Sequence, residues 1–219
     1  MLPFTREQFL AVFAHYNVAI WPLQVVAALL GIAIVVALLL RRSLAGIRVA
    51  GTGLALMWLW TGVVYHGVFF ARINPAAFAF ASLFVVQGML LAYTAWIARG
   101  DAERPHAAGI RAGLGWALVV YAGLLYPLVG WLSGHAYPAA PVFGVTPCPV
   151  TLFTFGALLL AAQPVARHLL VIPALWAVVG GSAAFLLNVA QDWPLLIGGL
   201  AATALLWHRG QRRPSPATT

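Results

Sequence analysis

Long apolar segments separated by short polar ones run through most of this chain, and they constrain its fold more than any other feature. An apolar stretch of about 20 residues is long enough to cross a bilayer as a helix. The apolar segments that fit this length lie at residues 18–40, 47–70, 76–98, 110–132, 149–166, 169–188 and 192–208. We therefore expect an all-α protein, an integral membrane bundle of about seven transmembrane helices.

The composition excludes a soluble globular domain. Charged residues make up 7% of the 219 residues, whereas soluble domains contain about 25%. The net charge of +8 comes from arginine, because the chain has no lysine. Arginines at the ends of apolar segments are explained by membrane orientation and need no nucleic acid as a partner. The expected partner is the lipid bilayer, and the expected location is the cytoplasmic membrane of the cell.

The arginines predict how the bundle is oriented. Ten of the twelve fall on one side, and Arg6 and Arg72 fall on the other. The ten are Arg41, Arg42, Arg48, Arg99, Arg104, Arg111, Arg167, Arg209, Arg212 and Arg213. By the positive-inside rule this side is cytoplasmic, so the N-terminus is outside and the C-terminus is cytoplasmic. We expect one transmembrane domain over residues 1–209 and a disordered cytoplasmic tail over residues 210–219.

Two short patterns predict local structure. Thr5, followed by Glu7 and Gln8, is expected to cap a short helix, with Phe9, Val12 and Phe13 on one face. This pattern predicts a short N-terminal helix lying at the membrane interface. Glycines four residues apart, at Gly109-x-x-x-Gly113 and Gly130-x-x-x-Gly134, are typical of close helix crossings.

The single cysteine stands between two prolines in V-T-P-C-P-V-T-L-F-T-F-G. We expect Pro149 to begin the fifth span with Cys148 as its cap, and the outer loop before it to fold over the bundle. Cys148 would then point toward the mouth of the bundle. A thiol at a helix N-terminus favours metal binding or nucleophilic attack, whereas a thiol without such a role packs as a small hydrophobic group.

Outer-face histidines and Cys148 suggest a metal site. His66 ends the outward half of the second span, and His135 opens the long outer loop. Imidazole and thiolate together suit zinc or copper, so His66, His135 and Cys148 form a candidate metal site. They have no local ligand spacing, and the fold would have to bring them together. The alternative is a set of interfacial histidines hydrogen-bonded to loop carbonyls.

Polar residues within apolar segments are few. Gln24 and Gln87 lie inside predicted spans and should face other helices, where they would either bridge helices or line a solute path. No carboxylate lies in the middle of a predicted span, which argues against a proton relay. The other residues that we expect to line an outer pocket or path are Tyr16, Asn17, Tyr65, Thr151 and Asp192.

Several segments together resemble a known family. They are A-H-Y-N-V-A-I-W-P-L-Q, V-V-Y-H-G-V-F-F-A-R-I-N-P-A-A, G-H-A-Y-P-A-A-P-V-F-G and T-P-C-P-V-T-L-F-T-F-G. The chain resembles, over nearly its whole length, a family of uncharacterised bacterial multi-spanning membrane proteins that is known as a domain of unknown function. The most specific part of the resemblance is P-C-P-x-T-x-F-T. The resemblance implies a membrane bundle and supplies no reaction.

Three functional classes remain open. The first is a binding, sensor or assembly protein with a pocket on the outer face, whose partner is a protein or a small-molecule ligand. The second is a membrane enzyme that uses an outer His/Cys metal site. The third is a transporter of a small neutral solute. Whether the protein is an enzyme is not decided by the residues.

Overall fold

The computed structural model describes residues 3–40, 43–98, 107–161 and 164–209, which form helices joined by loops. The predicted tail lies outside the described residues. The elements are α1 (Arg6–Ala19), α2 (Leu23–Leu40), α3 (Leu44–Trp60), the π-helix η1 (Thr61–Phe69), the 3-10 turn η2 (Phe70–Arg72), α4 (Ala77–Ile97), α5 (Gly109–Val120), the π-helix η3 (Tyr121–Leu125), α6 (Tyr126–Leu132), α7 (Pro147–Leu160), α8 (His168–Leu186), the 3-10 turn η4 (Ala190–Asp192) and α9 (Trp193–Arg209).

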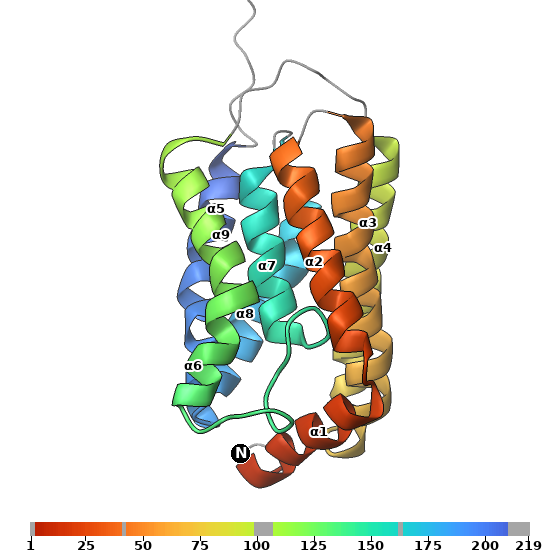
Figure 1. The fold of residues 1–219 in the computed structure, drawn as a ribbon, viewed down its shortest axis with the longest axis vertical. Coiled ribbons are helices and arrows are strands. Elements are labelled where there is room, and N and C mark those ends of the chain that lie inside the picture. Colours follow the sequence, from red (N-terminus) through yellow and green to blue (C-terminus); the bar gives the residue numbers. More distant parts are fainter. Residues whose placement is uncertain (1–2, 41–42, 99–106, 162–163, 210–219) are drawn as a thin grey trace, which may run out of the picture.

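The helices from α2 to α9 form a bundle, and α1 lies across one end of it (Figure 1). The chain bends by 87° between α1 and α2. Helix α7 lies inside the bundle, and every one of its residues from Pro147 to Leu159 is buried. The loop between α6 and α7 runs over the same end of the bundle as α1.

Helices occupy all of the apolar stretches that the sequence predicts to be spans. Four continuous helical segments are long and apolar enough to cross a membrane, and α1 with α2 makes a fifth if that bent pair is one span. Helices α7 and α9 have 14 and 17 residues, so each is shorter than a usual span. The all-α class is confirmed, while the number of seven spans and their orientation stay predictions.

Helix α1 begins as the sequence predicts. The Thr5 side chain accepts a hydrogen bond from the Gln8 backbone N–H, and the Gln8 side chain accepts one from the Thr5 backbone N–H. This reciprocal pair satisfies two donors that the first turn would otherwise leave free. Phe13 is buried and stacks on Tyr65 of η1, with 5.4 Å between ring centroids. The short N-terminal helix therefore packs its aromatic face onto the bundle.

Helix α7 begins two residues earlier than predicted. Thr146 is the extended residue before the helix, and Pro147 is its first helical residue. Proline suits this position, because its φ is already helical and its missing N–H has no acceptor there. Pro149 also lies in the first turn, where the same argument applies. The expectation that Cys148 caps the helix is wrong, and its thiol lies within the first turn.

Helices α5 and α7 approach closely at Gly115 and Gly156. Neither glycine belongs to the Gly-x-x-x-Gly patterns of the sequence. A Cβ on Gly156 would lie 2.8 Å from the carbonyl oxygen of Gly115. In contrast, a Cβ on Gly109 or Gly113 would meet nothing within 4 Å. The predicted crossing at Gly109 and Gly113 is therefore wrong, and the backbones meet at Gly115, two residues beyond Gly113.

Replacing Gly156 by alanine should destabilise the bundle, because the added methyl group must push α5 and α7 apart. The expected loss is about 1–3 kcal/mol in the free energy of unfolding in detergent, as for overpacked cores. Gly113→Ala is the control, since it adds the same methyl group to α5 in open space. Equal stability of the two variants would contradict this close contact.

Candidate functional site

A cavity of about 200 Å³ lies beneath α1, at the end of the bundle that α1 covers. It is bounded by α1, η1, η2, α4, the start of α7, α8 and η4. Its aromatic lining residues are Phe4, Phe9, Phe13, Tyr65, Phe70, Phe80 and Trp176. Its further polar lining residues are His66, Asn74, Cys148, Ser182 and Asp192. The lining therefore combines apolar surface with a few polar groups, as is common in small-molecule sites.

His66 is the most unusual residue of this cavity. Its side chain is fully buried, and neither ring nitrogen has a hydrogen-bond partner. Aromatic rings surround it, with centroid distances of 4.8 Å to Phe84 and 5.1 Å to Trp176. The indole N–H of Trp176 is also without a partner. Because buried polar atoms without partners are costly, this group is the strongest indication of a ligand.

Local backbone geometry places Tyr65 and His66 in the wall. Both lie in the π-helix η1, which continues α3 toward the α1 end of the bundle. A π-helix is wider than an α-helix and is frequently found at functional sites. Tyr65 packs edge-on against Tyr16, with 5.3 Å between ring centroids. Nothing in the apolar sequence of this segment predicts the change of helix type.

Asp192 lies in η4, the turn between α8 and α9, and its side chain is 3% exposed. Its carboxylate accepts a hydrogen bond from the Tyr126 hydroxyl group. Burial raises the pKa of the Asp192 carboxyl group to about 7, and interactions with Tyr126 and the Cys148 thiol oppose that rise. Asp192 and Cys148 thus lie together on one side of the cavity.

His135 is held elsewhere, in a polar bridge beside the cavity. Its Nε2 lies 2.8 Å from the guanidinium NH2 of Arg6, and its Nδ1 lies 3.3 Å from Oε1 of Gln191. A guanidinium group only donates hydrogen bonds, so Nε2 must accept and Nδ1 must carry the proton that it donates to Gln191. The lone pair that a metal would need is therefore used by Arg6.

The structure does not bring the three predicted metal ligands together. His66 and Cys148 line the cavity, whereas His135 does not. Within the described ranges, no group of three His, Cys, Asp or Glu side chains is arranged to hold a metal ion. The physical reason is that Arg6 and Gln191 satisfy both nitrogens of His135. The residues thus do not fit a zinc or copper ion with this ligand set.

Three of the predicted pocket residues instead tie α1 to its surroundings. The Tyr16 hydroxyl group donates to the Val145 carbonyl at 2.6 Å. The Asn17 amide donates to the Pro138 carbonyl at 2.7 Å, and the Gln24 amide donates to the Asn17 carbonyl at 2.7 Å. These bonds link α1, α2 and the loop between α6 and α7, so they position the helix that covers the cavity.

Gln87 and Thr151 also make structural contacts. The Gln87 amide donates to the Leu169 carbonyl at 3.1 Å, which joins α4 to α8. The Thr151 hydroxyl group donates to the Pro147 carbonyl at 2.8 Å within α7. Neither these two residues nor Gln24 belong to the lining of the cavity beneath α1. Gln87 and Gln24 thus bridge helices, and Thr151 bonds within its own helix.

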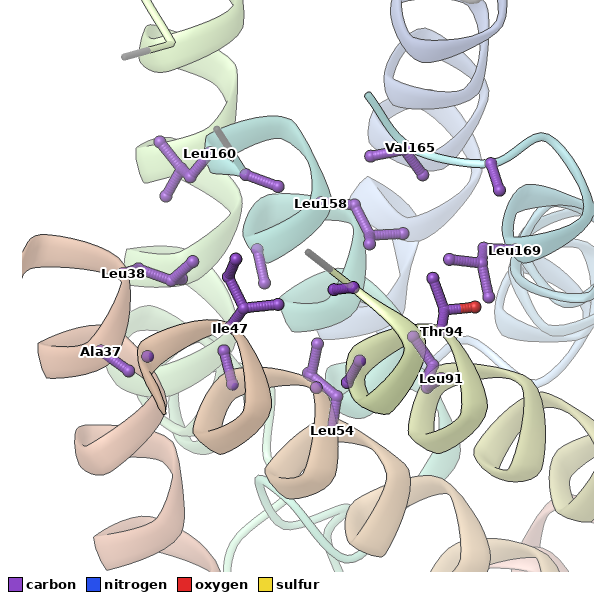
Figure 2. A pocket seen from close by; sticks show the side chains of 18 of the residues that line it. Ala37, Leu38, Ile47, Leu54, Leu91, Thr94, Leu158, Leu160, Val165 and Leu169 are labelled. Atoms are coloured by element: carbon purple, nitrogen blue, oxygen red, sulfur yellow. The ribbon is translucent and has the colours of Figure 1, made fainter. Parts of the chain in front are cut away.

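A second cavity, of about 160 Å³, lies toward the other end of the bundle. Figure 2 shows its side chains, which come from α2, α3, α4, α7, α8 and the segment before α8. They are aliphatic except for Thr94. The two cavities share no lining residue. The chemical groups that could recognise a polar ligand are therefore at the α1 end.

Sequence reasoning missed two contributors to this site. Trp176 lies within an apolar stretch of α8, where nothing distinguishes it from a membrane-facing tryptophan. The sequence does distinguish Arg6, because it is one of the two arginines on the side where the positive-inside rule predicts few. An arginine on that side needs local partners, and Arg6 finds them in His135 and the Leu187 carbonyl.

The region that forms the bundle and nearly all of the cavity matches one protein family over residues 6–215. The chain belongs to the family of unknown function DUF6064. The match confirms the resemblance to a domain of unknown function over most of the chain. No curated protein and no solved structure matches this DUF6064 chain. Its function must therefore be inferred from the cavity itself.

The buried carboxyl group should make stability depend on pH. The pKa of Asp192 is about 7 in the folded protein and 3.8 for an unperturbed group, so the folded state holds this proton more tightly. The free energy of unfolding should therefore fall as the pH rises from about 4 to about 7 and then level off. Asp192→Asn should flatten this slope in chemical unfolding experiments. The same slope in both proteins would show that Asp192 is not the group responsible.

Proposed function

We propose that this protein is a multi-pass protein of the cytoplasmic membrane that binds a small, largely apolar molecule in the cavity beneath α1, at the outer end of the bundle. The observation that carries the proposal is His66, a buried imidazole in the cavity wall with neither nitrogen bonded. The arginine distribution supports the outer location of this end. The cavity has the apolar surface and the few polar groups that binding of a small molecule requires.

The size of the cavity suits a ligand of about ten non-hydrogen atoms or fewer. An apolar cavity of about 150 Å³ in another protein is known to bind benzene. The cavity beneath α1 is somewhat larger, at about 200 Å³. Phe70 and Trp176 supply apolar surface, and His66 supplies one hydrogen-bond donor and one acceptor. A compact molecule with a ring or short chain and one polar group matches this lining.

The covering helix supports a binding or sensing function. Phe9 and Phe13 of α1 line the cavity, so a ligand would contact α1 directly. The same helix is fixed to the rest of the protein by Arg6, whose guanidinium group donates to the Leu187 carbonyl at 2.9 Å. Occupation of the cavity would therefore change the contacts that hold α1 in place. Such coupling is what a membrane sensor or assembly protein requires.

The enzyme and transporter alternatives have less support. A cysteine nucleophile needs a neighbouring base; His66 forms no hydrogen bond to Cys148, and the Asp192 carboxyl group beside the thiol is already hydrogen-bonded to Tyr126. A transport path needs continuous polar or open space, whereas α7 is buried between the ends of the bundle. The two glutamines expected on such a path, Gln24 and Gln87, bond to backbone carbonyls. No contact in the described residues favours either alternative over binding.

Toluene is a suitable first probe, because it tests the apolar part of the cavity alone. We expect it to raise the thermal midpoint of the detergent-solubilised protein in a saturable way. Val179→Trp should abolish the shift, since Val179 lines the cavity and a larger side chain would fill it. Val178→Trp is the matched control, because Val178 is the neighbouring residue and faces outward at 45% exposure.

The comparison between the two variants separates specific binding from a general solvent effect. Toluene in the micelle would affect both tryptophan variants alike. If wild type and both variants respond equally to toluene, the cavity does not bind it and the proposed function fails.

A further inference from the structure

We infer that the natural ligand of this cavity is a small organic cation, an amine with an apolar body whose ammonium group pairs with Asp192. This inference rests on the proposed binding function and names the chemical class of the ligand. Three features of the cavity support it: a buried carboxyl group, a wall of aromatic rings and an unpaired imidazole.

The carboxyl group of Asp192 lacks a cationic partner in the part of the chain that the structure describes. Its interaction partners are the hydroxyl group of Tyr126 and the thiol of Cys148, which are both neutral groups. Arg6 of α1 lies at this end of the bundle, and its guanidinium group bonds to the Leu187 carbonyl and to His135. A buried carboxylate is stabilised strongly by a cation, so a positively charged ligand would complete this site.

The aromatic rings add a second attraction for a cation. The faces of aromatic rings carry negative potential, and cages of such rings bind ammonium groups. Phe70 and Tyr65 are stacked with 5.9 Å between ring centroids, and Phe80 and Trp176 meet edge to face at 5.4 Å. All four rings line the cavity that contains Asp192. The same rings provide apolar surface for the body of the ligand.

His66 fits the same class of ligand. An ammonium group donates up to three hydrogen bonds, and a neutral imidazole has one nitrogen that accepts. His66 and Asp192 line the same cavity, so one primary amine can serve both groups. A hydrocarbon ligand would leave His66 without a partner, at the cost of buried unsatisfied polar atoms.

An anionic ligand is disfavoured by the charges of the lining residues. A carboxylate or phosphate would be placed near the carboxyl group of Asp192, and neither arginine nor lysine lines the cavity. His66 is the one basic lining residue, and a neutral imidazole carries no charge that could pair with an anion. The cavity therefore selects a cation over both neutral and anionic molecules of the same shape.

Three probes of nearly equal size test this inference: benzylamine, benzyl alcohol and toluene. Each is titrated into the purified full chain in mildly alkaline buffer, and its affinity is obtained from the thermal shift and confirmed by calorimetry. We expect benzylamine to bind about tenfold or more tightly than benzyl alcohol, as a buried charge pair should give. Asp192→Asn should remove the preference while keeping toluene binding. Glu7→Gln is the matched control, because it removes an exposed carboxylate from α1.

The outcomes distinguish the inference from the proposed function. If benzylamine binds no more tightly than benzyl alcohol to the wild type, the cation inference is wrong, although binding of toluene would still uphold the proposed function. If none of the three probes binds, both fail. If Asp192→Asn does not fold, the preference of the wild-type protein and of Glu7→Gln for benzylamine over benzyl alcohol still decides between these outcomes.

Discussion

A polar group inside an apolar bundle must find a partner within the protein, and the whole structure depends on this constraint. Several buried polar side chains meet it by bonding to a backbone carbonyl on another segment. Tyr16 bonds to Val145, and Gln87 bonds to Leu169. His66 in the cavity beneath α1 differs, because both of its ring nitrogens lack a partner in the described chain, whereas Gln87 leaves only its Oε1 unpaired. This contrast indicates that the cavity is adapted to a ligand.

The same constraint explains what the sequence could predict. Apolar length predicted where the helices lie, and the Thr5–Gln8 capping box predicted the start of α1, because both depend on local residues. The metal-site prediction depended on tertiary partners, which the local sequence does not specify. His135 and Cys148 were both expected at the outer face, but the sequence gives no means of seeing that Arg6 and Gln191 would occupy both nitrogens of His135.

The arrangement at the α1 end links ligand binding to the position of a helix. Side chains of α1 line the cavity, while Arg6 and Asn17 attach the same helix to the turn after α8 and to the loop before α7. A ligand in the cavity therefore contacts an element that is held by polar bonds at its two ends and by the packing of Phe13 and Tyr16 on η1. For a DUF6064 protein this arrangement provides a physical route from an occupied cavity to a change in the position of α1.

The most direct test of the central claim is to locate a ligand in the cavity. Crystals grown with para-bromotoluene would show the bromine by its anomalous scattering. We predict one strong peak between Phe70 and Trp176 in the wild-type protein and none there in Val179→Trp, whose larger side chain fills the space. Bromine only at the lipid-facing surface of the helices would contradict the claim that this cavity binds small molecules.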